Sequence, residues 1–253
     1  MKKALLTSIV SSLALTGAAL ADGNHKAHAI NQDGAILSPE DPAKVASFDI
    51  LAAHAHREGN LVTFHMTTAG TAGANQPDPS GALGGAPVWS YVWPTSLDPS
   101  AVGFEGGTGI LAMAATSHPD FDDTPLFDEN NDGDPANDGL LWHSHWVVLA
   151  PHPQCPDGGL GVVDIPEGEN PQLPATWPGL PILIDSPGWQ PIFNEENLDI
   201  QVAFDSTVSL QNMQFDAVTA GLRVNQSVHE PLLCVTDVFD TAGSLELPGR
   251  INQ

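Results

Sequence analysis

Apolar and β-prone residues occur along the chain in short runs, and nearly all of these runs end at Gly, Pro, Asn or Asp. No window shows the 3.6-residue apolar period of an amphipathic helix. The runs that predict strands are 48–56, 61–68, 88–93, 110–117, 140–150, 160–165, 182–185, 198–204, 217–224 and 232–239. This spacing is typical of an antiparallel sandwich or barrel. We expect an all-β fold, a single antiparallel β-sandwich of roughly ten strands with long loops rich in Gly, Pro and Asp.

The first 21 residues have the pattern of an export signal. Lys2 and Lys3 precede an apolar run over 4–15, and Ala19-Leu20-Ala21 matches a signal-peptidase site. The alternative is a membrane anchor, but the run is shorter than the ~20 apolar residues that a spanning helix needs. We expect a signal peptide over 1–21, a flexible polar leader over 22–44 and the β-sandwich domain over 45–253. The mature protein is then periplasmic or secreted, without membrane insertion.

Composition narrows the possible partners. The chain has 31 acidic and 7 basic residues and a formal net charge of -24. Binding to nucleic acid without help is excluded, because it needs Lys and Arg to replace phosphate counterions. Docking on anionic lipid headgroups is disfavoured for the same reason. The 42% of hydrophobic residues nevertheless supply a sizeable core, so the chain is not a disordered acidic tail.

Cys155 and Cys234 are the two cysteines of the chain. An isolated pair in an oxidising compartment most often forms one disulfide, and we predict that these two do. The alternative is a thiolate that binds metal or attacks a substrate. No CxxC motif or thiol-activating pattern surrounds either cysteine, which favours the disulfide.

Two pairs of histidines have the spacing H-x-H: His54 with His56, and His143 with His145. Alternate residues of a strand point to the same face, so each pair presents two imidazoles side by side. A two-residue turn at Gly59-Asn60 or at Glu58-Gly59 places His65 on the same face as His54 and His56. A three-residue loop would place His65 on the opposite face.

Three such nitrogens suit Zn²⁺ or Cu²⁺, and we predict a metal site at His54, His56 and His65. The alternative is a set of hydrogen-bonded surface histidines. On the second strand, Trp142 and Trp146 flank His143 and His145 in sequence and project to the opposite face of the strand. If that strand neighbours the hairpin, five histidines converge; if not, there are two sites or none.

His118 follows the run over 110–117 and is expected to join one of these two clusters. The carboxylates of the segment 118–123 suit either interpretation of the acidic loop that follows, a calcium site or a solvated loop.

An acidic loop begins like the calcium loop of an EF-hand, with Asp128, Asn130, Asp132, Gly133 and Asp134 in the pattern D-x-N-x-D-G-D. Position 12 is Gly139 rather than Glu, and no helices flank the loop. We therefore hypothesise a calcium site in a β-loop, completed by Asp138. The alternative is a solvated acidic loop.

These features predict an exported metal-binding protein that holds Zn or Cu through histidines on adjacent strands and acts as a carrier, buffer or sensor. A transporter or another membrane protein is a possible partner of such a carrier. No nucleophile elbow, P-loop, dinucleotide-binding or haem-attachment motif is present, and catalysis is less favoured than binding. The alternatives are a metal-dependent enzyme at the same histidines and a Ca-dependent extracellular binding module.

We predict that the loop from Asp128 to Asp138 binds Ca²⁺ with a dissociation constant of about 10⁻⁴ to 10⁻³ M, as extracellular modules do. A ligand of the native state alone raises stability, so millimolar Ca²⁺ should raise the melting temperature above its value in chelator. Equal melting temperatures in Ca²⁺ and in chelator would favour the solvated loop.

Overall fold

The computed structural model describes residues 29–252, and nearly all of the regular structure is β. The predicted signal peptide and the first residues of the leader, with His25 and His28, lie outside the described residues. Two short 3-10 helices, η1 (Pro99–Val102) and η2 (Pro156–Gly158), accompany the strands. In the described part of the chain, no helix has the length and apolar character needed to cross a membrane.

The first sheet is antiparallel and open, with the strand order β1-β2-β3-β4-β11-β10. Its strands are β1 (Ala29–Ile30), β2 (Ile36–Leu37), β3 (Ile50–Glu58), β4 (Leu61–Thr68), β11 (Asn197–Ala203) and β10 (Ile192–Asn194). Along β4, buried residues alternate with half-buried ones, so one face of this sheet packs inward and the other faces solvent.

The second sheet is also antiparallel, with the order β6-β5-β13-β14-β8-β7-β9. Its strands are β5 (Pro87–Pro94), β6 (Ile110–Ser117), β7 (His143–Pro151), β8 (Leu160–Val162), β9 (Ile184–Asp185), β13 (Val218–Val224) and β14 (Leu233–Thr241). β6 pairs with β7 as well as with β5, and this pairing closes the sheet into a barrel. A separate two-stranded sheet joins β12 (Gln214–Phe215) to β15 (Gly249–Arg250).

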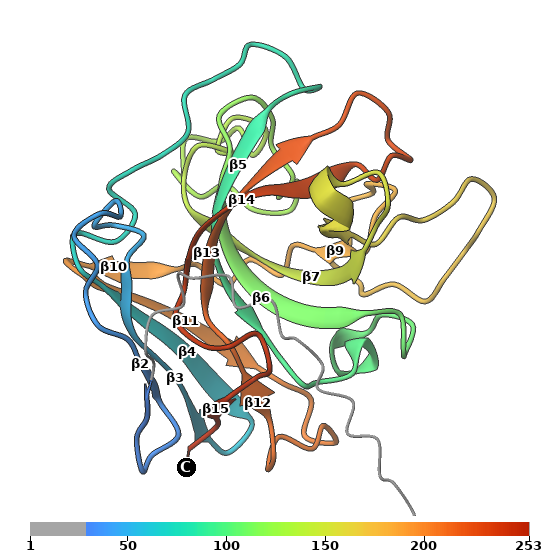
Figure 1. Ribbon diagram of the computed structural model, residues 1–253. Helices are drawn as coiled ribbons and strands as arrows, with labels where there is room; N and C mark the ends of the chain where they lie inside the picture. Colours follow the sequence, from blue (N-terminus) through green and yellow to red (C-terminus); the bar gives the residue numbers. More distant parts are fainter. Residues whose placement is uncertain (1–28, 253) are drawn as a thin grey trace, which may run out of the picture.

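The all-β, antiparallel prediction is confirmed, but the sandwich is corrected to a barrel-like sheet with the open sheet beside it (Figure 1). β6 and β7 are buried along both faces, unlike β4. One face lines the barrel interior, and the other packs toward the open sheet. Alternation along one strand identifies its apolar face, but it does not say which strands pair, so closure was not visible in the sequence.

Two hydrophobic cores follow from this arrangement. The larger core joins the outer face of the barrel to the open sheet, and its largest side chains include Phe64, Trp93 and Trp146. Ring contacts connect them: the ring centroid of Phe64 lies 6.0 Å from that of Trp93 and 5.9 Å from that of Trp146. The smaller core fills part of the barrel interior with aliphatic side chains such as Val88 and Ile182.

The predicted disulfide between Cys155 and Cys234 is confirmed. It lies at the weakest seam of the barrel, because β14 and β8 share one residue pair, Cys234 with Gly161. A Cβ at Gly161 would come within 3.0 Å of the Cys155 sulfur, so glycine permits this close approach. Closing a loop across 79 residues stabilises the fold by about 4.5 kcal/mol in the chain-entropy model.

The later part of the predicted leader, from Ala29, carries regular structure. β1 pairs with β2, and β2 pairs with β3 at the edge of the open sheet. Ile36 is fully buried in the larger core. No local sequence pattern indicates these strands, because each has two residues and neither shows alternation.

The single tyrosine of the chain, Tyr91, provides a test of the larger core. Its hydroxyl donates to the Ser47 carbonyl at 2.8 Å and accepts from the Gly73 amide at 2.8 Å. Burial raises the pKa of Tyr91 to about 12, although these hydrogen bonds oppose the shift. Tyrosinate absorbance should therefore appear near pH 12 in the folded protein, but near pH 10 in denaturant.

Because Tyr91 ionises only in the unfolded state between these two values, the free energy of unfolding should fall as pH rises from about 10 toward 12. The fall should reach about 2 to 3 kcal/mol. In a Tyr91→Phe variant, this part of the fall in the free energy of unfolding between about pH 10 and pH 12 should be absent. Tyrosinate absorbance near pH 10 in the folded protein would contradict the packing described here.

Candidate metal centre

Four titratable side chains meet inside the barrel: His118, Asp123, His143 and His145. One ligand atom from each lies within 4.8 Å of the others, and the residues are only 1%, 4%, 2% and 1% exposed. Within residues 29–252, this is the one group of three or more His, Cys, Asp or Glu with such an arrangement.

Strand geometry brings the three histidines together. His143 and His145 start β7 and share its inward face, as the H-x-H spacing predicted. Thr116 of β6 pairs with His143, and its hydroxyl lies 3.1 Å from the His143 Nε2. His118 lies two residues beyond Thr116, so it points to the same side.

Gly139 fixes the position of His118. The His118 amide donates to the Gly139 carbonyl at 2.7 Å. A Cβ at Gly139 would lie 1.8 Å from the Phe121 carbonyl oxygen and 2.6 Å from that of His118. Any larger residue would therefore push the segment that follows β6 away from β7.

Backbone carbonyls orient all three imidazoles in the same way. The Nδ1 atoms of His118 and His143 lie 2.9 Å from the Phe121 oxygen and 2.7 Å from the Leu141 oxygen. The His145 Nδ1 lies 3.3 Å from the Asp185 oxygen and 3.2 Å from the Ser186 hydroxyl. A carbonyl only accepts, so Nδ1 carries the proton and the lone pair of each neutral ring lies on Nε2.

The three Nε2 atoms converge on one oxygen of Asp123. Its Oδ1 lies 3.2 Å from the Nε2 of His118, 3.2 Å from that of His143 and 3.3 Å from that of His145. The Nε2 atoms of His118 and His143 are 2.9 Å apart. Lone pairs thus face one another across a buried space, and this arrangement needs a proton or a metal ion between them.

The Asp123 main chain is held in place by its neighbours. The Ser186 hydroxyl donates to its carbonyl at 2.7 Å. The preceding Asp122 accepts from the Thr124 amide at 2.8 Å and from the Asp138 amide at 2.9 Å. These contacts direct the Asp123 carboxylate into the barrel rather than toward solvent.

Charge in the cluster keeps Asp123 ionised. Burial alone raises the pKa of its carboxyl, but the charges of the neighbouring His145 and His118 outweigh burial. The pKa of Asp123 therefore lies well below its ordinary value. A buried carboxylate requires a compensating cation, which either a protonated imidazole or a metal ion provides.

The donor set fits a divalent transition metal. Three imidazole nitrogens and one carboxylate oxygen are ligands that Zn²⁺ takes at about 2.0 to 2.2 Å. A tetrahedron of that size has edges of roughly 3.4 Å. The Asp123 Oδ1 lies 3.2 to 3.3 Å from each nitrogen, the Nε2 atoms of His118 and His143 are 2.9 Å apart, and all four ligand atoms lie within 4.8 Å of one another. The bonds from Nδ1 to carbonyls are the outer contacts that metal-binding histidines usually make.

Two more acids lie beside the cluster. Burial raises the pKa of Glu129, and the charge of His143 is the strongest influence that opposes this rise. The Thr124 hydroxyl donates a hydrogen bond of 3.2 Å to the Glu129 carboxylate. Burial also raises the pKa of Asp185, opposed by a hydrogen bond of 2.6 Å from Thr176. Glu129 is therefore a candidate proton acceptor beside the candidate metal centre, and no spacing in the sequence indicates it.

Of the six histidines predicted to bind metal, the structure brings together His118, His143 and His145. Asp123 had been noted only among the carboxylates of the segment 118–123. Its role depends on the loop that carries it back into the barrel, and no spacing rule indicates this. The odd spacing of Asp123 from His118 follows no strand period, so the sequence offered no means of choosing it over Asp120 or Asp122.

The other three histidines lie on the solvent-facing side of the open sheet. His54 pairs with His65 across a two-residue turn at Gly59-Asn60, and their rings stack with centroids 4.3 Å apart. His65 contacts Asp199 at 2.7 Å through Nδ1 and Thr67 at 2.9 Å through Nε2. His56 contacts Asn252 at 2.8 Å. β3 and β7 belong to different sheets, so the five histidines do not converge.

Hydrogen bonds within the acidic loop engage the oxygens predicted to bind calcium. Asp128 accepts from the amides of Asp132 and Gly133, and the side chains of Asn130 and Asp132 contact each other at 3.2 Å. Asp134 accepts from Ala136 at 3.2 Å.

Asp138, predicted to complete the calcium shell, is buried and accepts from the Glu129 amide at 2.9 Å. The Asp138 amide also donates to Asp122 at 2.9 Å, so the base of the loop is connected to the segment that carries Asp123. The calcium site itself stays a prediction.

Comparison with known proteins adds no identity: no family model matches the chain, and no curated protein or solved structure matches it.

Proposed function

We propose that this is an exported metal-binding protein that holds one divalent ion at His118, Asp123, His143 and His145. The observation that carries the proposal is the common orientation of the three imidazoles, each with Nδ1 against a carbonyl and Nε2 toward Asp123. The disulfide is consistent with an extracytoplasmic protein. The strongly acidic chain also favours the approach of cations.

Zn²⁺ fits better than Cu²⁺, although the sequence favoured neither. Cu²⁺ prefers a square-planar or tetragonal arrangement, in which one pair of ligands lies about 4 Å apart across the metal. The Asp123 Oδ1 is nearly equidistant from the three nitrogens, at 3.2 to 3.3 Å. No nitrogen therefore lies opposite the oxygen, and this agrees with a tetrahedral ion.

Burial bears on how the ion is used. All four ligand residues are at most 4% exposed, so an ion held by them has little contact with solvent. Such a site favours slow exchange and long retention, which suits a store or sensor better than a carrier that transfers its ion rapidly. Retention also suits the second candidate, a metal-dependent enzyme, and the raised pKa of Glu129 near His143 favours that candidate.

We expect the purified protein to contain about one equivalent of Zn²⁺ and to lose stability when the ion is removed. At a thousandfold excess over the dissociation constant, the ion contributes about 4 kcal/mol, which is roughly 10 °C in melting temperature for a chain of this size. Elemental analysis and thermal unfolding with and without a chelator would measure both. Absence of metal with an unchanged melting temperature would show that protons hold the cluster.

Variants distinguish this centre from adventitious binding. Asp123→Asn preserves shape but removes the charge, and His145→Gln preserves a polar side chain; each should weaken Zn²⁺ binding at least about a hundredfold. His152→Ala, in the turn after β7, should leave affinity unchanged. Circular dichroism identifies any variant that fails to fold. Full affinity in a folded Asp123→Asn variant would exclude the centre.

The surface trio of His54, His56 and His65 remains a second proposed site. Burial and then the neighbouring His65 lower the pKa of His54, which favours the neutral imidazole that a metal needs. We predict weaker binding here, because His65 already contacts Asp199 and Thr67.

A second, weaker equivalent of Zn²⁺ or Cu²⁺ should disappear in a His54→Ala/His65→Ala variant, with the first equivalent unchanged. The fold should persist, since the opposite face of these strands carries the core. Identical titrations of variant and parent would identify the trio as ordinary surface histidines.

A further inference from the structure

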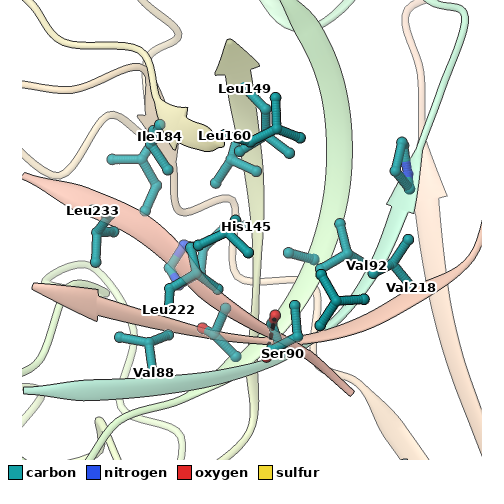
Figure 2. A pocket seen from close by; sticks show the side chains of 18 of the residues that line it. Val88, Ser90, Val92, His145, Leu149, Leu160, Ile184, Val218, Leu222 and Leu233 are labelled. Atoms are coloured by element: carbon teal, nitrogen blue, oxygen red, sulfur yellow. Dashed lines mark hydrogen bonds between the residues drawn. The ribbon is translucent and has the colours of Figure 1, made fainter. Parts of the chain in front are cut away.

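The barrel contains an apolar cavity of about 130 Å³ that none of the metal chemistry requires (Figure 2). Its walls come from the inward faces of the barrel strands and are almost entirely aliphatic, including Val88, Val92, Leu149, Leu160, Leu222 and Leu233. Cavities of about 150 Å³ with such walls stay dry and accept molecules of the size of benzene. The volume therefore suits about six to eight non-hydrogen atoms.

The metal centre forms one wall of this cavity. His118, Asp123 and His145 all line it, and Phe121 lines it as well, with its ring stacked 4.0 Å from that of His118. The Asp123 Oδ1 and His145 Nε2 are buried without a hydrogen-bond partner. By contrast, the Ser90 hydroxyl at the cavity already donates to the Ala220 carbonyl at 2.9 Å. Because these two atoms belong to the proposed ligand set, a donor that enters the cavity meets the metal centre at this wall.

The cavity also reaches the surface. Val238 and Leu245 line it and are nevertheless 59% and 65% exposed, so they mark its mouth. Leu245 has a φ of 59°, a left-handed conformation that L-residues with large side chains rarely adopt. An apolar molecule can therefore enter between these two side chains without opening the four-ligand cluster.

We propose that the cavity binds a small, neutral, largely apolar molecule, such as one aromatic ring, with a single donor atom directed at the metal as a fifth ligand, since zinc can expand from four ligands to five. The proposal rests on the proposed function for its metal. Neutrality follows from the aliphatic walls and from the net charge of -24, both of which oppose an anion. A single donor atom on the bound molecule is expected because the metal centre forms only one wall of the cavity, and the other walls are aliphatic.

Benzene and pyridine form a matched pair of probes, because they have nearly the same size and only pyridine carries a donor nitrogen. Calorimetric titration of the Zn²⁺-loaded protein should show saturable binding of both, with pyridine at least tenfold tighter. Chelator-treated protein should lose this preference and still bind benzene.

Ala220→Leu fills the cavity from β13, away from the metal-binding strands β6 and β7, and should weaken benzene binding at least tenfold. Ala203→Leu adds the same atoms on an exposed part of β11 and should have no effect.

Zinc content is measured on every sample, so the two proposals fail in distinguishable ways. A protein that holds stoichiometric Zn²⁺ but binds neither probe overturns the cavity proposal alone. Equal affinities for benzene and pyridine in the loaded protein also overturn it, because the molecule then does not reach the metal. A folded protein that takes up no Zn²⁺ overturns the proposed function, and the cavity proposal with it.

Discussion

The antiparallel pairing of β6 with both β5 and β7 determines most of what this molecule can do. It closes the second sheet, so the inward faces of these strands meet one another instead of solvent. The same strands are covered on their outer faces by the open sheet and its aromatic core. A polar side chain on an inward face therefore has no water to bind, and it needs a partner inside the barrel.

Closure has a weak point, where a covalent bond compensates for missing hydrogen bonds. β8 has three residues and shares a single residue pair with β14. Cys234 belongs to that pair, and its disulfide to Cys155 spans the seam. A cavity inside the barrel persists only if the wall stays closed, since an opening seam would let side chains collapse or water enter. The disulfide and the cavity are thus parts of one arrangement.

Each of the ten runs expected from the sequence corresponds to an observed strand at nearly its observed position, because short apolar runs between turn residues have few other solutions. The turn at Gly59-Asn60, with His54 paired to His65, is one of the registers that the sequence left open, beside a turn at Glu58-Gly59 and a three-residue loop. Five strands of two or three residues, β1, β2, β10, β12 and β15, were missed. Their two or three residues form through contacts with neighbours far along the chain, and they leave no local pattern.

The candidate site was predictable only in part, and for a related reason. His143 and His145 could be placed side by side from strand geometry alone. Their partners could not: His118 joins them because β6 neighbours β7, and Asp123 because Gly139 lets the intervening loop pass close to His118. Local spacing favoured the hairpin histidines, which the structure places at the surface, while long-range pairing created the buried cluster.

Burial of the cluster provides the strongest argument that it is built for an ion. An ionised Asp123 and three imidazoles with converging Nε2 atoms replace apolar packing in the barrel, and such a group stabilises a fold only when each member is satisfied. One proton on one ring balances the charge of Asp123, and the Thr116 hydroxyl lies within hydrogen-bond distance of the His143 Nε2, but the His145 Nε2 is left buried without a hydrogen-bond partner. A tetrahedral cation satisfies all four atoms at once.

Because the carbonyls of Phe121, Leu141 and Asp185 already fix the other side of each ring, the rings have little freedom to turn away. The geometry that makes the metal-free cluster unfavourable is therefore the geometry that favours a bound ion.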